Sequence, residues 1–219
     1  MPLALVFVML APLPNLMAAA GWNVNNIDVT DGQDEARTVF CKGETVKLTV
    51  TDTCSSTAKR SYSWSPGGST NNPLILTNLN SGNYIYTVTV TIGGESGQAS
   101  AGFTVVQVAS ISTNSNFSAT TYPIYVGSNT TIKFYAKPSP VGQWPAGKPA
   151  WGGVASGSGS DQATVTFNTV GTNYVTAECG NTVTATVVVI KVDTETVATT
   201  PVNRSRTKIG IGEEIVCNV

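Results

Sequence analysis

Residues 61–68 read SYSWSPGG, which places Trp64 on a serine-rich segment and ends that segment at once with Pro66 and two glycines. Pro and Gly in succession mark a turn. A Trp just before such a turn is either a surface platform for a ligand or a buried side chain that closes a core. The sequence on either side decides between these two interpretations.

After residue 21 the sequence alternates apolar and polar residues with the period of a β-strand. NYIYTVTVTI (83–92) and GETVKLTV (43–50) both follow this pattern. Such alternation predicts half-buried strands, and no helical period persists beside it. Only 11% of the residues are charged, against about a quarter in an average globular protein. The chain is therefore expected to be all-β.

A weak internal repeat indicates tandem domains. Gly43, Gly127 and Gly212 each open a strand, and Trp64 and Trp151 follow the first two of these glycines. We expect short linkers near 109–111 and 193–200. We also expect four segments: a signal peptide (1–20), a first sandwich (21–108), a second sandwich (109–192) and an incomplete third repeat (193–219).

The third repeat stops in its second strand, and half a sandwich cannot close a core. Three arrangements would complete it. The chain is a fragment of a longer protein, or the tail packs onto the second copy, or its strand is donated to a neighbouring molecule. We expect the first, because a strand-opening glycine with little sequence after it is typical of an interrupted array.

About seven short strands in each copy fit two aligned sheets packed face to face. In immunoglobulin-like sandwiches a buried Trp lies on the third strand, which is the position of Trp64 and Trp151. We therefore expect both Trp side chains in the core. The full set of predicted core residues is Trp64, Trp151, Tyr84, Tyr86, Leu48 and Ile132.

One long stretch carries a family resemblance. YSWSPGGSTNNPLILTNLNSGNYIYTVTVT (62–91) resembles the Y-x-W-x-x-G … L-x-x-G-x-Y-x-Y-x-V-x-V pattern of PKD-type domains and of related repeats in bacterial surface adhesins. The starts of the first and third repeats (41–50 and 209–219) resemble bacterial Ig-like tandem repeats. The acidic DFGDG that often follows the Trp in PKD domains is replaced by SPGG (65–68). The resemblance implies a spacer, stalk or adhesive module in an exported protein.

The N-terminus has the pattern of a secretory signal peptide. An apolar run (Leu3–Leu10) too short to span a bilayer is followed by prolines and by an A-x-A site at Ala18–Ala20. The alternative is an N-terminal core strand. The net charge is −1 with no basic cluster, which argues against a nucleic-acid partner, and no later segment reaches the length of a membrane span.

Catalytic and metal-binding patterns are weak. The chain has no His, which removes Ser-His-Asp triads, HExxH sites and His-bearing zinc clusters. The acids are scattered, so we expect no catalysis and no cofactor. The densest acidic stretch is a weak calcium candidate, although its spacing differs from an EF-hand loop and a turn between strands is favoured. Its four acids are Asp28, Asp31, Asp34 and Glu35.

Export permits disulfides, but the spacing of the four cysteines leaves their pairing open. Cys41 and Cys54 flank one extended strand, beyond disulfide reach unless the chain folds back. Cys179 is predicted on the inward face of the sixth strand of its copy without a partner there, so the simplest expectation is a buried, unpaired thiol. Cys217 lies in the incomplete third repeat.

Trp144 is the best candidate for ligand binding, because it lies in a loop (137–153) that the sandwich does not need. An exposed aromatic side chain there would stack on a sugar, with Tyr122 and Tyr125 as neighbours. The alternative is that Trp144 covers the end of the core under a stiff, Pro-rich loop.

We therefore expect a secreted or cell-surface, non-catalytic structural segment. Its partners are other domains of the same polypeptide or cell-surface components. Two alternatives stay open: a carbohydrate-binding accessory module of a polysaccharide-active enzyme, with polysaccharide as the partner, and a filament subunit that assembles by donating its C-terminal strand.

Overall fold

The computed structural model describes residues 22–191, 198–199, 204–205 and 215–216. The predicted signal peptide and Cys217 lie outside these residues, as does most of the predicted third repeat. The described part of that repeat is a small sheet of two-residue strands, β15 (Ala198–Thr199), β16 (Arg204–Ser205) and β17 (Ile215–Val216).

Two sheets form the first sandwich. One has the strand order β1 (Val24–Thr30), β3 (Val46–Asp52) and β5 (Leu74–Leu76). The other has the order β4 (Arg60–Ser65), β6 (Gly82–Ile92) and β7 (Glu95–Ser112), with β2 (Val39–Cys41) running parallel to β7.

The second sandwich begins in the second half of β7. There β7 pairs with β9 (Thr130–Ser139), which pairs with β12 (Gln162–Phe167). The facing sheet contains, in order, β11 (Gly157–Ser158), β10 (Ala150–Gly153), β13 (Gly171–Glu178), β14 (Thr182–Ile190) and β8 (Ile124–Gly127).

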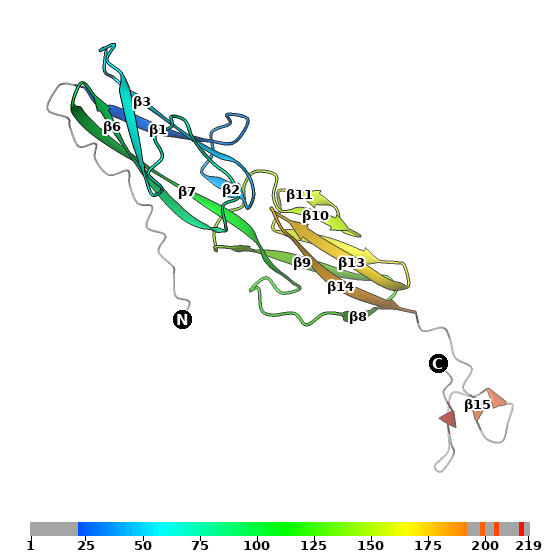
Figure 1. Cartoon of the computed structure of the whole chain (residues 1–219). Helices are drawn as coiled ribbons and strands as arrows, with labels where there is room; N and C mark the ends of the chain where they lie inside the picture. Colours follow the sequence, from blue (N-terminus) through cyan, green and yellow to red (C-terminus); the bar gives the residue numbers. More distant parts are fainter. Residues whose placement is uncertain (1–21, 192–197, 200–203, 206–214, 217–219) are drawn as a thin grey trace.

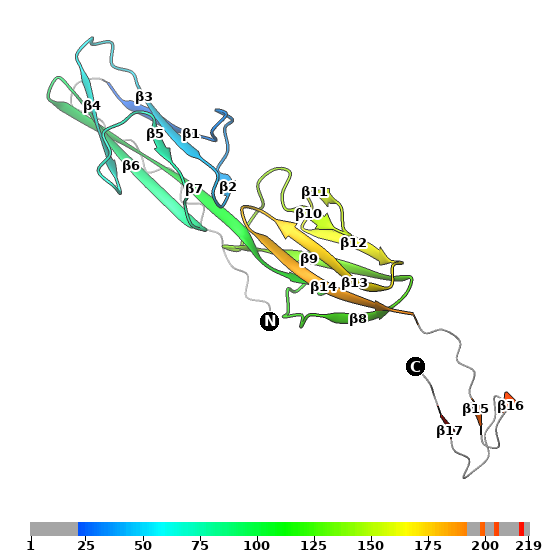
Figure 2. The same cartoon turned by 45° about the vertical axis from the view of Figure 1, so that its right-hand side comes forward.

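Both sandwiches connect their strands in the same way (Figures 1 and 2). If the short strands β2, β8 and β11 are set aside, the first, second and fourth strands of each sandwich form one sheet, and the remaining strands form the other. In each sandwich a short strand, β2 or β8, runs parallel to the last strand. This is the strand order of an immunoglobulin-like sandwich, and the predicted all-β, Ig-like fold class is confirmed.

Each sandwich has its own hydrophobic core that contains the predicted Trp, and Trp22 is also buried in the first core. Trp64 is 1% exposed and Trp151 is 7% exposed. Each indole donates a hydrogen bond to a backbone carbonyl, Trp64 to Asn71 (2.7 Å) and Trp151 to Ser160 (2.9 Å). Of the other predicted core residues, Leu48 and Tyr86 are buried, and Tyr84 and Ile132 are half-buried at the edges of the cores.

β7 is one continuous strand of 18 residues that belongs to both sandwiches. The predicted boundary after residue 108 falls inside it, so the linker predicted near 109–111 is wrong: these residues are strand, with a register shift between Val108 and Ser110. The two sandwiches use opposite faces of β7. Val105 belongs to the first core and the adjacent Val106 to the second.

The turn before β9 also differs from the predicted repeat. Gly43 precedes β3 with a positive φ of 84°, and the residue in the matching turn before β9 is Asn129, with a φ of 66°. Gly127 lies two residues earlier. The backbone bonds agree with this offset, because Lys42 N donates to Val106 O (2.8 Å) and Ser128 N donates to Ile190 O (3.0 Å).

Candidate functional site at the junction of the sandwiches

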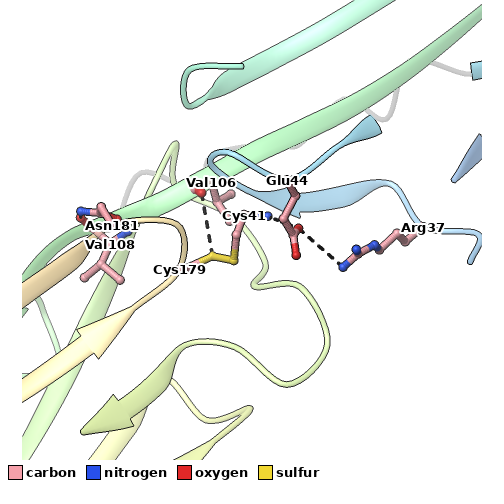
Figure 3. Close-up of a disulfide and its surroundings, with 7 residues drawn as sticks. All are labelled: Arg37, Cys41, Glu44, Val106, Val108, Cys179 and Asn181. Carbon is pink, nitrogen blue, oxygen red and sulfur yellow. Dashed lines mark hydrogen bonds and ion pairs between the residues drawn. A yellow bond between two sulfur atoms is a disulfide. The ribbon is translucent and has the colours of Figure 1, made fainter. Parts of the chain in front are cut away.

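A disulfide joins the two sandwiches (Figure 3). Cys41 ends β2 in the first sandwich, and Cys179 follows β13 in the second, 138 residues later. The expectation of an unpaired thiol at Cys179 was therefore wrong. In the chain-entropy model, closing a loop of this length stabilises the folded state by about 5 kcal/mol.

Polar contacts hold Cys41 in place from the side of the first sandwich (Figure 3). Its backbone N–H donates to the Glu44 carboxylate (2.6 Å), and the same carboxylate lies 3.6 Å from the Arg37 guanidinium. The next residue, Lys42, donates its N–H to Val106 O on β7 (2.8 Å). The end of β2 is thus fixed before it meets Cys179.

Asn181 makes a second connection, two residues after Cys179. Its side-chain Oδ1 accepts a hydrogen bond from Val108 N, and its Nδ2 donates to Val108 O, both at 2.8 Å. A side-chain amide here satisfies both backbone groups of one residue of β7, as a neighbouring strand would. The β13–β14 hairpin is therefore attached to the shared strand as well as to β2.

Gly180, between these two residues, allows the hairpin to approach closely. Its φ is +72°, and a Cβ at this position would overlap the carbonyl of Lys42. Cys41, Val106 and Val108 are all at most 3% exposed and pack in the core of the second sandwich. The junction is therefore a packed continuation of the second core, with no free linker between the sandwiches.

The two other cysteines differ. Cys54 is a free, half-buried cysteine whose backbone N–H donates to the Asp52 carboxylate (3.0 Å). Cys217 lies outside the described residues. Spacing within one repeat could not reveal the Cys41–Cys179 pair, since it joins residues of different repeats. The pair of adjacent apolar residues Val105–Val106 is a sequence signal for a strand with two buried faces, and it was missed.

The structure does not gather the predicted ligand-binding residues into one site. Trp144 is half-buried against the second core and lines an open hollow together with Gln143, Lys148 and Asp161. Tyr122 also packs on that core, and its hydroxyl donates to Ile111 O (3.2 Å). Burial raises its pKa. Tyr125, on edge strand β8, is 66% exposed.

The acidic stretch forms the turn after β1 and stabilises it by hydrogen bonds. Asp31 is buried and accepts hydrogen bonds from the backbone of Glu35 and Gln33 and from Arg37, which together hold its pKa below the ordinary value. Asp34 pairs with Lys47 (2.6 Å), and Asp28 is exposed. Among the described residues, no three His, Cys, Asp or Glu side chains are grouped as a metal site would need.

The ranges that the structure describes contain no helix long and apolar enough to cross a membrane.

No family model and no curated protein matches the chain. Among solved structures, it is similar to domains 4 and 5 of the S-layer protein SbsC (13% identity, TM-score 0.35), covering 76% of this chain and 98% of that one. It is also similar to immunoglobulin domains 1–4 of Sidekick-1 (12%, TM-score 0.34, covering 78% and 50%). Fibronectin(III)-like modules of Clostridium thermocellum CbhA give 12% and 0.27, covering 74% and 94%. These likenesses concern the fold alone, which the strand order establishes independently.

Proposed function

We propose that the chain is a non-catalytic structural or adhesive segment, a spacer or stalk, of an exported bacterial surface or secreted protein. Its role is to hold neighbouring domains at a fixed separation and angle. The bacterial and adhesin context comes from the PKD-like pattern around Trp64. The disulfide supports export, since such bonds persist in oxidising compartments.

The junction is the observation that carries this proposal. Tandem domains usually move relative to one another unless the interface between them is extensive and apolar. Here β7 is shared, the disulfide joins the sandwiches, and the Asn181 side chain bonds to both the backbone N–H and the backbone C=O of Val108. A spacer needs these restraints, whereas an enzyme that closes on a substrate would need a hinge at this point.

Rigidity can be measured directly. We expect small-angle scattering of the full chain to fit one fixed arrangement of the sandwiches, and 15N relaxation to give a common tumbling tensor for both. Cys41→Ala/Cys179→Ala and Asn181→Ala should increase the independent motion, and Cys54→Ala, which leaves the junction intact, is the matched control. Independent tumbling of the two sandwiches with the disulfide closed would contradict the spacer function.

A second candidate function is carbohydrate binding, favoured by the hollow beside Trp144. A half-buried indole next to amide, ammonium and carboxylate groups offers both a stacking surface and hydrogen bonds to a sugar. The exposed tyrosines Tyr125 and Tyr174 lie on the β8–β14–β13 sheet and not in this hollow.

A glycan array and a polysaccharide pull-down test this second function. Trp144→Ala should abolish binding, whereas Val141→Ala should not, because Val141 is 64% exposed in the same loop but does not line the hollow. Tyr125→Ala tests whether the outer face contributes. Binding that none of these substitutions changes would place the sugar elsewhere, and no binding by any protein would remove the candidate.

A further inference from the structure

We propose that the Cys41–Cys179 disulfide makes this segment a tension-bearing link of limited extension, because the covalent path between its ends bypasses most of both sandwiches. The proposal rests on the structural function above, since a stalk or spacer is the kind of segment that is pulled. It adds a mechanical property that neither the fold nor the rigid junction requires.

The bypass follows from where the two cysteines lie in the chain. The chain reaches Cys41 through β1 and β2 and leaves Cys179 through β14. Strands β3 to β13 therefore lie inside a closed covalent loop (Figure 3 shows its closing bond). When the ends are pulled apart, tension runs along the backbone to Cys41, across the sulfur–sulfur bond, and onward from Cys179. The backbone of residues 42–178 is not part of this covalent path.

Few strands of the two sandwiches can then be pulled away. They are β1 and β2 at the N-terminal side and β14 at the C-terminal side. β1 is held by its pairing with β3, β2 by its parallel pairing with β7, and β14 by strands on both its edges, β13 and β8. After these strands detach, β3 to β13 stay tied together, however far they unfold, because the loop that contains them cannot open.

The length that stays locked is large. A fully extended chain gains at most about 3.5 Å per residue. The 138-residue separation of the cysteines thus withholds on the order of 480 Å of extension. The segments outside the loop, 22–41 and 179–190, contribute only on the order of 110 Å. The oxidised segment should therefore yield less than a quarter of the length that the same segment yields without the bond.

Burial protects the bond while the sandwiches are folded. Cys41 is 3% exposed and Cys179 is 0% exposed, and an exchanging thiolate must reach a sulfur directly. The load path should therefore stay closed until β2 or β14 detaches. A free thiol elsewhere in the chain, at Cys54, is half-buried and is removed in the control below.

Single-molecule force spectroscopy of the full chain, held by handles at its two termini, tests the proposal. The Cys54→Ala protein is stretched oxidised, stretched after reduction in denaturant and refolding in reductant, and compared with Cys54→Ala/Cys41→Ala/Cys179→Ala. We expect the total contour length released to be larger by on the order of 480 Å in the reduced protein and in the triple variant. Residues outside 22–190 contribute equally to all three and cancel.

Each outcome has a distinct meaning. A shortfall of that size in the oxidised protein alone supports the bypass, and equal lengths in all three proteins overturn it. If the triple variant does not fold, the reduced protein still gives the comparison. The scattering and relaxation experiment tests the spacer function separately. A flexible junction, together with the expected shortfall in contour length, would overturn the rigid spacer but keep the bypass. A rigid junction without a shortfall would do the reverse.

Discussion

The two sandwiches have the same strand order but are held together by different interactions. All four ion pairs within residues 22–190 join side chains of the first sandwich, and its core contains stacked rings of Tyr84, Tyr86 and Phe103. The second core relies on small and β-branched residues with one edge-on pair of rings, Phe134 and Phe167. The two copies thus share one strand order, while the interactions that stabilise it differ from one copy to the other.

The hairpins between the last two strands differ in the same way. The β6–β7 hairpin turns at Gly93 and Gly94, where an added Cβ would meet nothing within 4 Å. The β13–β14 hairpin turns at Gly180 and Asn181 and packs against the first sandwich. The same hairpin is thus an exposed turn in the first copy and part of the junction in the second. Cys179, Gly180 and Asn181 make this difference.

The largest effect on stability is expected at the two equivalent Trp residues, one in each core. Trp64→Ala and Trp151→Ala each leave a cavity in a core, and we expect each to lower the free energy of unfolding by about 3–5 kcal/mol. Trp144→Ala, at a half-buried Trp of the same chain, should cost less. Urea unfolding followed by circular dichroism measures all three. If Trp151→Ala cost no more than Trp144→Ala, the two copies would not share a core residue at this position.

The next effect separates the two hairpins. Gly94→Ala places a side chain at a φ of +92° in open space and should cost about 1 kcal/mol. Gly180→Ala has the same backbone penalty, and its Cβ also overlaps the Lys42 carbonyl, so we expect a further loss of about 1–3 kcal/mol. Differential scanning calorimetry of the oxidised proteins gives the comparison. Equal losses of stability in the two variants would mean that the junction accommodates the added Cβ without any further loss.

The sequence predicted what depends on one strand or one repeat, and it missed what depends on how two repeats meet. Alternation placed the strands, and the fold position of the Trp residues placed the two cores. The alignment of the two repeats was wrong by two residues. Gly127 was aligned with Gly43 because both are glycines, but it is Asn129 that adopts the positive φ of Gly43. The disulfide could not be predicted, since no spacing rule relates two cysteines that are 138 residues apart.

The candidate ligand site shows the same limit. Tyr122 and Tyr125 are close in the sequence, and Trp144 lies in the loop that follows β9; the sequence predicted that these three residues would be neighbours. In the structure Trp144 and Tyr122 both pack against the second core, whereas Tyr125 is exposed on the edge strand β8, so the three side chains do not line one hollow. The hollow beside Trp144 is lined by Trp144 and by neither tyrosine.

A smaller effect is expected where the second-to-last long strand begins. Tyr84 donates through its hydroxyl to Asn80 O (2.8 Å), four residues back, which is a tyrosine corner. In the second copy Asn173 donates to Thr169 O, also four residues back, and to Gly171 O, both at 3.0 Å. The two residues thus make the same local connection with different groups.

Burial decides which of the two substitutions costs more. Tyr84→Phe removes one bond to an exposed carbonyl and should cost about 0.5–1.5 kcal/mol. Asn173 is 9% exposed, and Asn173→Ala removes both of its side-chain hydrogen bonds, so we expect about 1–3 kcal/mol. Chemical denaturation gives both values. A larger loss for Tyr84→Phe would show that the aromatic corner, and not the buried amide, is the stronger of the two connections.

The smallest effect concerns pH, and it should appear in the first sandwich only. The Arg60 guanidinium holds the pKa of Asp52 below its ordinary value of 3.8, and backbone N–H groups, with Arg37, do so for Asp31. A carboxyl whose pKa is lower in the folded state stabilises that state above the ordinary value and loses this contribution as the pH falls below it.

Hydrogen-exchange mass spectrometry between about pH 6 and about pH 2.5, corrected for intrinsic rates, should therefore show protection falling in β3 and persisting in β9. Asp52→Asn should lower the protection at neutral pH and flatten its fall in acid, because the amide cannot titrate. A parallel fall in both strands would mean that the disulfide and β7 couple the sandwiches so tightly that they open as one unit, and the difference in their chemistry would then have no separate consequence for stability.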